Sequence, residues 1–469
     1  MGFVFYDTET SGLSSAFDQI LQFAAIRTDP ELNEIERFEI RSRLGPSVIP
    51  HPKALDVTGT TVAQLTDKNL PSHYEMIREI REKMLEWSPA IIIGHNSIFF
   101  DEKFLRQSLY QTLHPPYLTN TSGNCRSDSL KIVQAVSVLV PNCISIPTDK
   151  SKQVFKLDQL APANGFDHSN AHDALADVEA TVFLCKLISE RAPDLWSNVT
   201  RMSQKQAALD FIQSEDEFCL FEAFFGKPYA WIVTPIGPSP EGGSDFLVFD
   251  LFVDPEPMMA MTDDALAKRL SQQPKPMRSV RVNACPLVFP VDDTPEIAKA
   301  LSIDQEERLR RANVLAENEE FRGRLISAFL STRKPWESSP HVEEQIYDAF
   351  LTREDEQFSS VFHDLSWVDR YDHLDQISDE RIKELGQRLI HAEKPDSLPK
   401  DIKTILDQEN AQRMITGVPG EESPWLTIPE AISETDKLIL EGENENKLLL
   451  DYRAYLEDRL VQETSIASN

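Results

Sequence analysis

The stretch "GFVFYDTETSG" (residues 2–12) joins an apolar run to two carboxylates, Asp7 and Glu9. An aromatic and β-branched run of this kind favours a strand. On a strand, residues i and i+2 point to one face, so the two carboxylates lie side by side and Phe3 and Phe5 continue their row. Neighbouring carboxylates repel each other, which favours a cation between them. A solvated strand end is the structural alternative.

The residues that follow predict a mixed α/β domain. "DQILQFAAIRTD" (18–29) and "RFEIRSRLG" (37–45) are two further apolar runs, so the chain begins as a strand meander. "YEMIREIREKMLEW" (74–87) has the apolar spacing of a helix, and "PAIIIGHN" (89–96) is a short apolar run typical of a buried strand. Strands that alternate with helices indicate the α/β class.

A third carboxylate opens the next predicted helix, "DEKFLRQSLYQ" (101–111). Asp101 follows a buried strand and a loop, which puts it at the edge of the sheet. Its structural alternative is a helix cap. Glu102 and Arg106 have the spacing of an ordinary surface pair on a helix.

The helix predicted within "SNAHDALADVEATVFLCKLI" (169–188) begins with one histidine and two aspartates. The first N–H groups of a helix are unpaired and the helix dipole is positive there, which explains Asp173. It does not explain Asp177, a full turn into the helix, or His172, just before it. Their structural alternatives are an exposed helix acid and a surface or core histidine.

Taken together, these elements fit metal-dependent phosphodiester hydrolysis. Four carboxylates, from Asp7, Glu9, Asp101 and Asp177, can hold two Mg²⁺ ions, which prefer oxygen ligands and activate water. Histidine exchanges protons near neutral pH, so His172 can take the proton of the attacking water.

The composition sets limits on this hypothesis. A chain of 469 residues predicts about three domains. The net charge of −30 argues against a nucleic-acid partner. However, 37 acidic and 20 basic side chains fall in residues 301–469, so more than half of the negative charge lies there and the N-terminal part of the chain can still form a local basic groove. The five cysteines contain no CxxC pair, so neither a disulfide framework nor a zinc site is indicated. No signal peptide or membrane span is visible, and we expect a cytoplasmic protein without membrane contact.

The composition and the hydrophobic pattern of the chain change twice. From about Asp194 to Pro290, short aromatic and β-branched runs alternate with Pro and Gly, which predicts a small β-rich domain. After Asn313 most segments are charged and helical in period, which predicts an acidic helical domain. Phe, Tyr and Trp of the central region are candidates for platforms that stack single-stranded bases, or equally for core residues.

Three motifs carry a family resemblance. "YDTETSG", "GHNSIFFDEKFL" and "NAHDALADVEAT" resemble the exonuclease motifs of the DEDD superfamily, in its histidine-containing branch, which has an RNase H-like fold. The longer "ANGFDHSNAHDALADV", together with "QFAAIRTD", "VNACPLVFP" and "EEQIYDAF", is similar to the bacterial exonuclease I family. The resemblance implies an RNase H-like exonuclease domain over residues 1–190, an SH3-like domain over 194–347 and a helical C-terminal domain over 350–469.

The same resemblance implies roles for individual residues. Asp7, Glu9, Asp101 and Asp177 are expected as ligands of two Mg²⁺ ions, with Mn²⁺ as a substitute, and His172 as the general base. Glu9 and Lys156 are expected to contact the substrate. Lys156 stands where the family keeps an arginine, so the charge is retained without the bidentate fork. Thr8 and Ser11 stand where bulkier residues are frequent, so contacts to the terminal base are expected to differ.

The function implied is 3′-to-5′ hydrolysis of single-stranded DNA to mononucleotides, in DNA repair and recombination, by a monomer. The implied protein partner is the acidic C-terminal tail of the single-stranded DNA-binding protein. Two alternatives stay open. A 3′-to-5′ exoribonuclease would use identical catalytic residues, and a noncatalytic nucleic-acid-binding scaffold would keep the fold alone.

Overall fold

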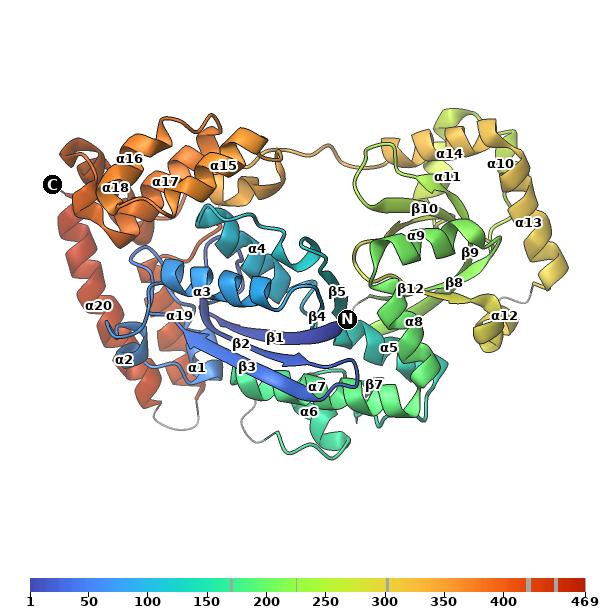
Figure 1. Cartoon of the computed structure of the whole chain (residues 1–469), viewed down its shortest axis with the longest axis horizontal. Coiled ribbons are helices and arrows are strands. Elements are labelled where there is room, and N and C mark those ends of the chain that lie inside the picture. The colour runs from blue at the N-terminus through green and yellow to red at the C-terminus, as the bar shows by residue number, and fades with distance from the viewer. Residues whose placement is uncertain (169–171, 225, 301–302, 419–422, 443–445, 469) are drawn as a thin grey trace.

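The computed structural model describes residues 1–168, 172–224, 226–300, 303–418, 423–442 and 446–468. Three positions of the histidine motif, 169–171, therefore lie outside the described residues. In Figure 1, the N-terminal sheet and the C-terminal helices form one half of the molecule, and a second sheet with its own helices forms the other half.

The N-terminal sheet has five strands in the order β3-β2-β1-β4-β5. Its strands are β1 (Gly2–Thr10), β2 (Ile20–Thr28), β3 (Glu34–Arg41), β4 (Ala90–Gly94) and β5 (Cys125–Asp128). The central strand β1 pairs antiparallel with β2 and parallel with β4. The predicted meander and the α/β class are confirmed.

Helices cover both faces of this sheet. They are α3 (His73–Glu86) and α4 (Asp101–Gln111) on one face, and α5 (Ser129–Leu139), α6 (Leu157–Ala163) and α7 (Ala174–Arg191) on the other. The same half contains η1 (Leu118–Asn120), a small hairpin of β6 (Thr148–Asp149) and β7 (Lys152–Gln153), and the short helices α1 (Pro52–Thr58) and α2 (Val62–Leu65), which pack against the C-terminal helices. Side chains alternate along β1, so Val4 and Tyr6 pack with α3 and α4, while Phe3 and Phe5 pack with α5, α6 and α7.

The second half contains a five-stranded antiparallel sheet in the order β11-β10-β9-β8-β12. Its elements are α8 (Pro193–Met202), α9 (Lys205–Ser214), β8 (Phe218–Phe224), β9 (Lys227–Pro238), β10 (Asp245–Asp250), α10 (Glu256–Met259), α11 (Asp263–Ser271), β11 (Met277–Arg281), β12 (Leu287–Pro290), η2 (Val291–Asp293), α12 (Pro295–Ala300), α13 (Gln305–Glu317) and α14 (Glu319–Ser331). The β-rich part therefore begins at Phe218, not near Asp194. Residues 193–202 and 205–214 form the helices α8 and α9 instead, and Leu195, Val199 and Met202 bury one face of the amphipathic helix α8.

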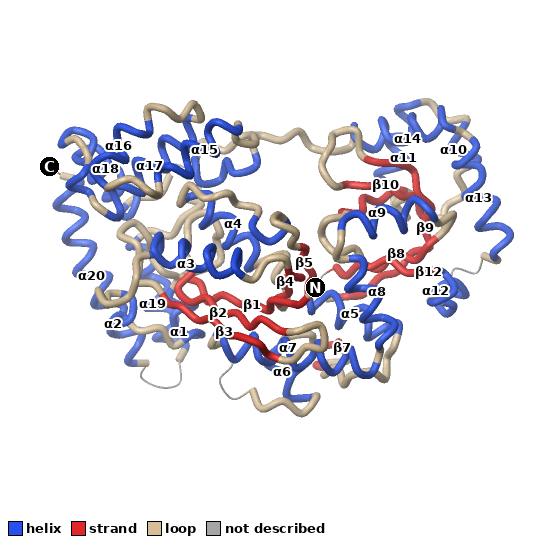
Figure 2. The backbone as a smooth tube through the Cα atoms, in the orientation of Figure 1, coloured by secondary structure: helices blue, strands red, loops and turns tan. Residues whose placement is uncertain are grey.

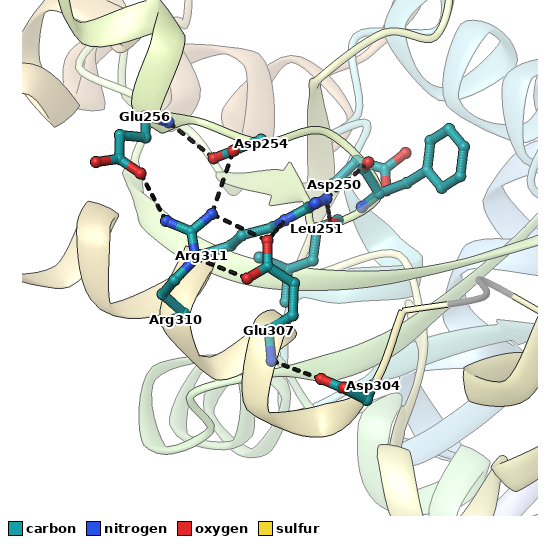
Figure 3. A network of polar contacts seen from close by, with 9 residues as sticks. Asp250, Leu251, Asp254, Glu256, Asp304, Glu307, Arg310 and Arg311 are labelled. Carbon is teal, nitrogen blue, oxygen red and sulfur yellow. Dashed lines mark hydrogen bonds and ion pairs between the residues drawn. The ribbon is translucent and has the colours of Figure 1, made fainter.

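A polar network joins α13 to the turn after β10 (Figure 3). Arg310 contacts Glu256 at 2.8 Å and Asp254 at 3.2 Å. Arg311 donates to the Leu251 carbonyl at 2.9 Å, and both arginines bind Glu307 at 2.7 Å. Because several charges share one network, it holds this helix on the second sheet better than isolated surface pairs would.

The C-terminal residues are helical, as the sequence predicts. The helices are η3 (Val342–Tyr347), α15 (Arg353–Phe362), α16 (Trp367–Leu374), α17 (Glu380–Glu393), η4 (Pro395–Ser397), α18 (Lys400–Ile415), α19 (Ile428–Glu441) and α20 (Lys447–Ala467). The tube view shows them on the side of the first sheet, reached by a long connection from α14 (Figure 2). Tyr452 of α20 donates to the Pro50 carbonyl at 2.5 Å. None of the described helices is long and apolar enough to span a membrane.

Candidate active site

Strand β1 places Asp7 and Glu9 on the face of the sheet that α7 covers. Phe3 and Phe5, which precede them on that face, share a core with Ala174 and Val178 of α7. Small residues at the start of α7 bring the helix close to the strand. One ligand atom each from Glu9, His172 and Asp177 consequently lie within 4.8 Å of one another, the spacing of a group that can hold a metal ion.

Two hydrogen bonds from Thr8 hold the Asp101 carboxylate in place. Its Oδ1 accepts hydrogen bonds from the backbone N–H of Thr8 at 3.0 Å and from the Thr8 hydroxyl at 2.6 Å. The third carboxylate is thus tied to the residue between Asp7 and Glu9. Thr8 and Ser11 are buried, and the Ser11 hydroxyl donates to Asp18 at 2.8 Å. Both side chains therefore bond within the protein, and the expected difference in contacts to the terminal base stays a prediction.

The loop between β4 and α4 is organised by Asp128. This carboxylate, at the end of β5, accepts from the N–H of Asn96 at 2.9 Å and of Ile98 at 3.1 Å, and it also caps α5 through the N–H of Leu130 at 3.0 Å. His95 supports the same loop through contacts of 2.9 Å to the Ser129 hydroxyl and to the Phe155 carbonyl. Sequence analysis missed both residues, although an aspartate before a helix start is a cap signal.

The prediction that Glu102 and Arg106 form an ordinary surface pair is wrong. The Glu102 side chain is 4% exposed, and it contacts Arg106 at 2.5 Å, the Thr119 hydroxyl at 2.7 Å and the guanidinium of Arg126. The helix face that carries Glu102 turns inward toward β5, where a buried carboxylate requires charged partners. The network fixes the start of α4 directly beside Asp101.

The polar residues at the start of α7 have different roles. Asp173 is the N-cap, accepts from the N–H of Ala176 at 3.4 Å and pairs with Arg41 at 2.7 Å, so its predicted structural role is confirmed. His172 is exposed and has φ of +68°, which is uncommon for a residue with a Cβ. One of its ring nitrogens lies within 4.8 Å of a carboxylate oxygen of Asp177. The start of α7 therefore brings the histidine close to this carboxylate.

A second histidine, His168, contacts Asp177 on the buried side of this carboxylate. Nε2 of His168 lies 2.8 Å from Oδ1 of Asp177, and the His168 side chain is 1% exposed. Sequence analysis did not single out His168. The available signal was its place four residues before His172 in the same motif.

Burial and mutual repulsion raise the pKa of the clustered carboxylates. The pKa of Asp7 is well above its ordinary value because the group is buried and faces Asp101, Asp177 and Glu9. Burial and the charges of Asp177 and Asp101 raise the pKa of Glu9 to about 8. Burial raises the pKa of Asp101 to about 6, although the hydrogen bonds from Thr8 oppose the shift. Such a group of oxygen donors is stabilised by a cation.

Lys156 lies apart from this group. It is the exposed N-cap residue of α6, next to Phe155, whose carbonyl contacts His95. Within the described residues, no hydrogen bond or ion pair joins its side chain to the four carboxylates. The fold therefore places an exposed cation next to the loop that carries Asp101.

Comparison with known proteins identifies the family. Residues 4–184 match the family model described as Exonuclease, and residues 204–331 match that of the Exonuclease I SH3-like domain. The exodeoxyribonuclease I of Escherichia coli (strain K12) is 31% identical over 371 residues, which cover 75% of this chain and 77% of that protein. The chain belongs to the exodeoxyribonuclease I family. The resemblance inferred from the three motifs is therefore confirmed.

Solved structures of the family have the same architecture. The moderately thermophilic exonuclease I of Methylocaldum szegediense superimposes with a TM-score of 0.84 at 25% identity, covering 98% of this chain and 99% of that one. The zinc-ion-bound form of the Escherichia coli exonuclease I complex with single-stranded DNA has a TM-score of 0.81 at 25% identity, with 99% of each chain covered. The predicted order of an exonuclease domain, an SH3-like domain and a helical region is confirmed.

Proposed function

We propose that this chain hydrolyses single-stranded DNA from its 3′ end and releases mononucleotides. Family membership makes it an exodeoxyribonuclease. Two observations carry the proposal. Asp101, Asp177 and Glu9 lie close enough to Asp7 to raise its pKa, and Glu9 and Asp177 lie within 4.8 Å of a ring nitrogen of His172, whose backbone φ is positive. The single-stranded DNA of the Escherichia coli complex supports the choice of substrate.

The four carboxylates are proposed to hold two Mg²⁺ ions, with Mn²⁺ as a substitute. Enzymes of this exonuclease family use divalent metals, and the donor set fits, because hard carboxylate oxygens with raised pKa values gain most from a nearby cation. When bound, the ions would supply an activated water and neutralise charge on the phosphate. Thr8 and the Glu102 network keep Asp101 in place for this task.

His172 is proposed as the general base, and Glu9 and Lys156 as substrate contacts. His172 is exposed at the start of α7, so its ring can reach a water on the substrate side of the carboxylates. A positioned base of this kind takes the proton of the attacking water. Lys156 would bind a phosphate as a point charge, since it lacks the fork of an arginine.

Three further proposals concern the biological role, the oligomeric state and the protein partner. The family resemblance favours a role in DNA repair and recombination, a monomeric enzyme, and binding of the acidic C-terminal tail of the single-stranded DNA-binding protein. We propose a first domain of residues 1–190 and a second that begins at residue 194. Because η3 (Val342–Tyr347) shares a core with the C-terminal helices, we place it in the helical domain and not at the end of the SH3-like domain, where the resemblance put the limit at residue 347. Sedimentation would measure the oligomeric state, and fluorescence anisotropy with a labelled tail peptide would measure the partner contact.

The decisive experiment is digestion of a single strand labelled at its 5′ end in one sample and at its 3′ end in another, with Mg²⁺ or with chelator. We expect the 3′ label to leave first as a mononucleotide, and the 5′-labelled strand to shorten stepwise only when metal is present. Faster digestion of an RNA strand of the same sequence would favour the exoribonuclease. Binding without cleavage at any metal concentration would favour the noncatalytic scaffold.

A further inference from the structure

A row of three polar side chains crosses the first sheet beside the candidate active site. Glu9 of β1 lies opposite Gln22 of β2, and Gln22 lies opposite Arg41 of β3. Side chains at directly opposed positions lie next to each other on one face of a sheet, so all three lie on the face that α7 covers. The row therefore extends from a proposed metal ligand on the central strand to the edge strand β3.

Asp173, the N-cap of α7, uses its two carboxylate oxygens differently. Oδ1 accepts the capping bond from the N–H of Ala176 at 3.4 Å. Oδ2 accepts from Nη2 of Arg41 at 2.7 Å and from Nε2 of Gln22 at 3.1 Å. Because a cap requires only one oxygen, the second oxygen is available to tie the start of the helix to the row that contains Glu9.

Gln22 connects the same elements from inside the protein. The residue is 1% exposed, its Nε2 also donates to Glu39 of β3 at 2.9 Å, and its Oε1 accepts from the N–H of Ala174 at 3.4 Å. A buried polar network whose members are all bonded fixes the relative position of the elements it joins. The first turn of α7 is therefore held against both β2 and β3.

The residue next to Asp173 is His172, the proposed general base. Its φ of +68° is uncommon for a residue with a Cβ, and such a conformation persists where the surrounding structure determines it. Asp173 is bonded to two strands and to the helix, so it fixes the chain at this point. A ring nitrogen of His172 lies within 4.8 Å of carboxylate oxygens of Glu9 and Asp177. The position of the base therefore depends on the bonds of its neighbour.

A second arginine of β3 provides a comparison. Arg37 lies four residues before Arg41 on the same face of the strand, and its Nη1 donates to Glu179 of α7 at 2.9 Å. Both arginines and both of their partners on α7 are partly exposed, and exposed ion pairs contribute little to stability. The two pairs therefore differ mainly in place, because one lies beside His172 and the other lies further along the helix.

We propose that Arg41 and Gln22 are positioning residues for the reaction, which act through Asp173 to hold His172 beside Glu9. This inference rests on the proposed function and names the residues that fix its general base. A base removes a proton only when it lies within hydrogen-bond reach of the attacking water. A displacement of about 1 Å can cost about a hundredfold in rate. Arg41 therefore serves the reaction without contacting DNA.

The test compares Arg41→Ala with Arg37→Ala in single-turnover digestion of an oligothymidylate at saturating Mg²⁺. Arg41→Ala should lower the maximal rate about 10- to 100-fold. The DNA concentration for half-maximal rate, and the affinity measured with Ca²⁺ in place of Mg²⁺, should stay unchanged. Arg37→Ala should cleave at the rate of the unaltered protein, and both variants should melt at similar temperatures, since each loses one exposed ion pair. Arg41→Lys keeps a charged donor for Asp173 and should recover most of the rate.

Two double variants test the route from Arg41 to the base. Asp173→Ser keeps an oxygen that caps the helix but removes the one that binds Arg41, so it should lose at least as much rate as Arg41→Ala. Adding Arg41→Ala to Asp173→Ser should then lower the rate no further. Adding Arg41→Ala to His172→Ala should also have no effect, because no base is left to position, and such non-additivity identifies residues that act together.

The outcomes separate this inference from the function on which it rests. If the unaltered protein digests single strands but the losses add in either double variant, Arg41 acts directly on the carboxylates or on DNA and the inference is overturned. Weaker binding of DNA by Arg41→Ala in Ca²⁺, with a shallower salt dependence, would overturn it in favour of a phosphate contact. Equal losses of rate in Arg41→Ala and Arg37→Ala would reduce both pairs to general support of α7. If the unaltered protein cleaves no single strand, the proposed function fails and the positioning role fails with it.

Discussion

Nε2 of His168 lies 2.8 Å from Oδ1 of Asp177, inside the protein and on the side of the carboxylate away from solvent. Among the described residues, neither ring nitrogen of His168 nor this oxygen has an aligned hydrogen bond. In the described part of the chain, Asp177 is therefore the one ion-pair partner of this buried histidine. Such partners orient metal-ligating carboxylates in many sites.

The first prediction is that His168→Ala raises the Mg²⁺ concentration for half-maximal activity about 10- to 100-fold, because Asp177 loses the group that orients it. A metal titration at saturating DNA measures this. His168→Gln, which keeps an N–H donor of similar reach, should recover most of the metal affinity. A lower melting temperature with an unchanged metal requirement would make His168 purely structural.

The second prediction concerns Asp7. Asp7→Asn should lower the rate of cleavage at least about a hundredfold, since metal catalysis contributes several kcal/mol and each 1.4 kcal/mol is about a factor of ten. In chelator, the variant should melt higher than the unaltered protein, because one of four repelling charges is gone. Asp149→Asn, at an exposed position of β6, is the control and should change neither quantity. Full activity of Asp7→Asn would remove the metal assignment.

The third prediction follows from the raised pKa values of Glu9, to about 8, and of Asp101, to about 6. An acid with a raised pKa in the folded state binds more protons folded than unfolded, so the free energy of unfolding falls as pH rises through that window. Without metal, the melting temperature should fall between about pH 5 and pH 8. Mg²⁺ should flatten this fall, because bound metal displaces those protons.

Differential scanning calorimetry with chelator and with Mg²⁺ measures the two pH curves. Glu9→Gln removes the group with the higher of the two values, and it should flatten the metal-free curve in the upper part of the range. Parallel curves with and without metal would show that these carboxylates do not share a site with the ion.

The fourth prediction is that His172→Ala lowers the single-turnover rate by about 10²- to 10⁴-fold, the usual contribution of a general base. The dependence of the rate on pH near neutrality should weaken, while Mg²⁺ binding survives. Rates from rapid-quench digestion across pH 5.5 to about 8.5 would cover the range in which histidine changes its charge. An unaltered profile with full activity would leave His172 a helix-start residue.

The fifth prediction concerns Lys156. Lys156→Ala should weaken binding of single-stranded DNA and reduce the salt slope by about 0.7, as expected for one lost phosphate contact. Lys152→Ala, an exposed lysine of the nearby strand β7, is the matched control and should leave the slope unchanged. Equal effects of the two substitutions would mean that Lys156 contributes only general charge.

The sequence by itself determined the elements that carry the site. The alternation in "GFVFYDTETSG" predicted a strand with Asp7 and Glu9 on one face, and β1 has that arrangement. Apolar periodicity likewise predicted α4 at Asp101, although its N-cap is Phe100 and not Asp101, and the cap Asp173 predicted the start of α7. These are local properties, set by side-chain direction along one element, and they do not depend on what packs against it.

Only the tertiary structure decided which side chains meet across elements. The spacing of Glu102 and Arg106 is the same on a surface and in a core, and burial against Arg126 of β5 made it a core network. Thr8 binds Asp101 across 93 positions of sequence, and the buried His168 lies 2.8 Å from Asp177. Periodicity within one segment holds no information about such contacts, since the partner element sets the distance and removes the water.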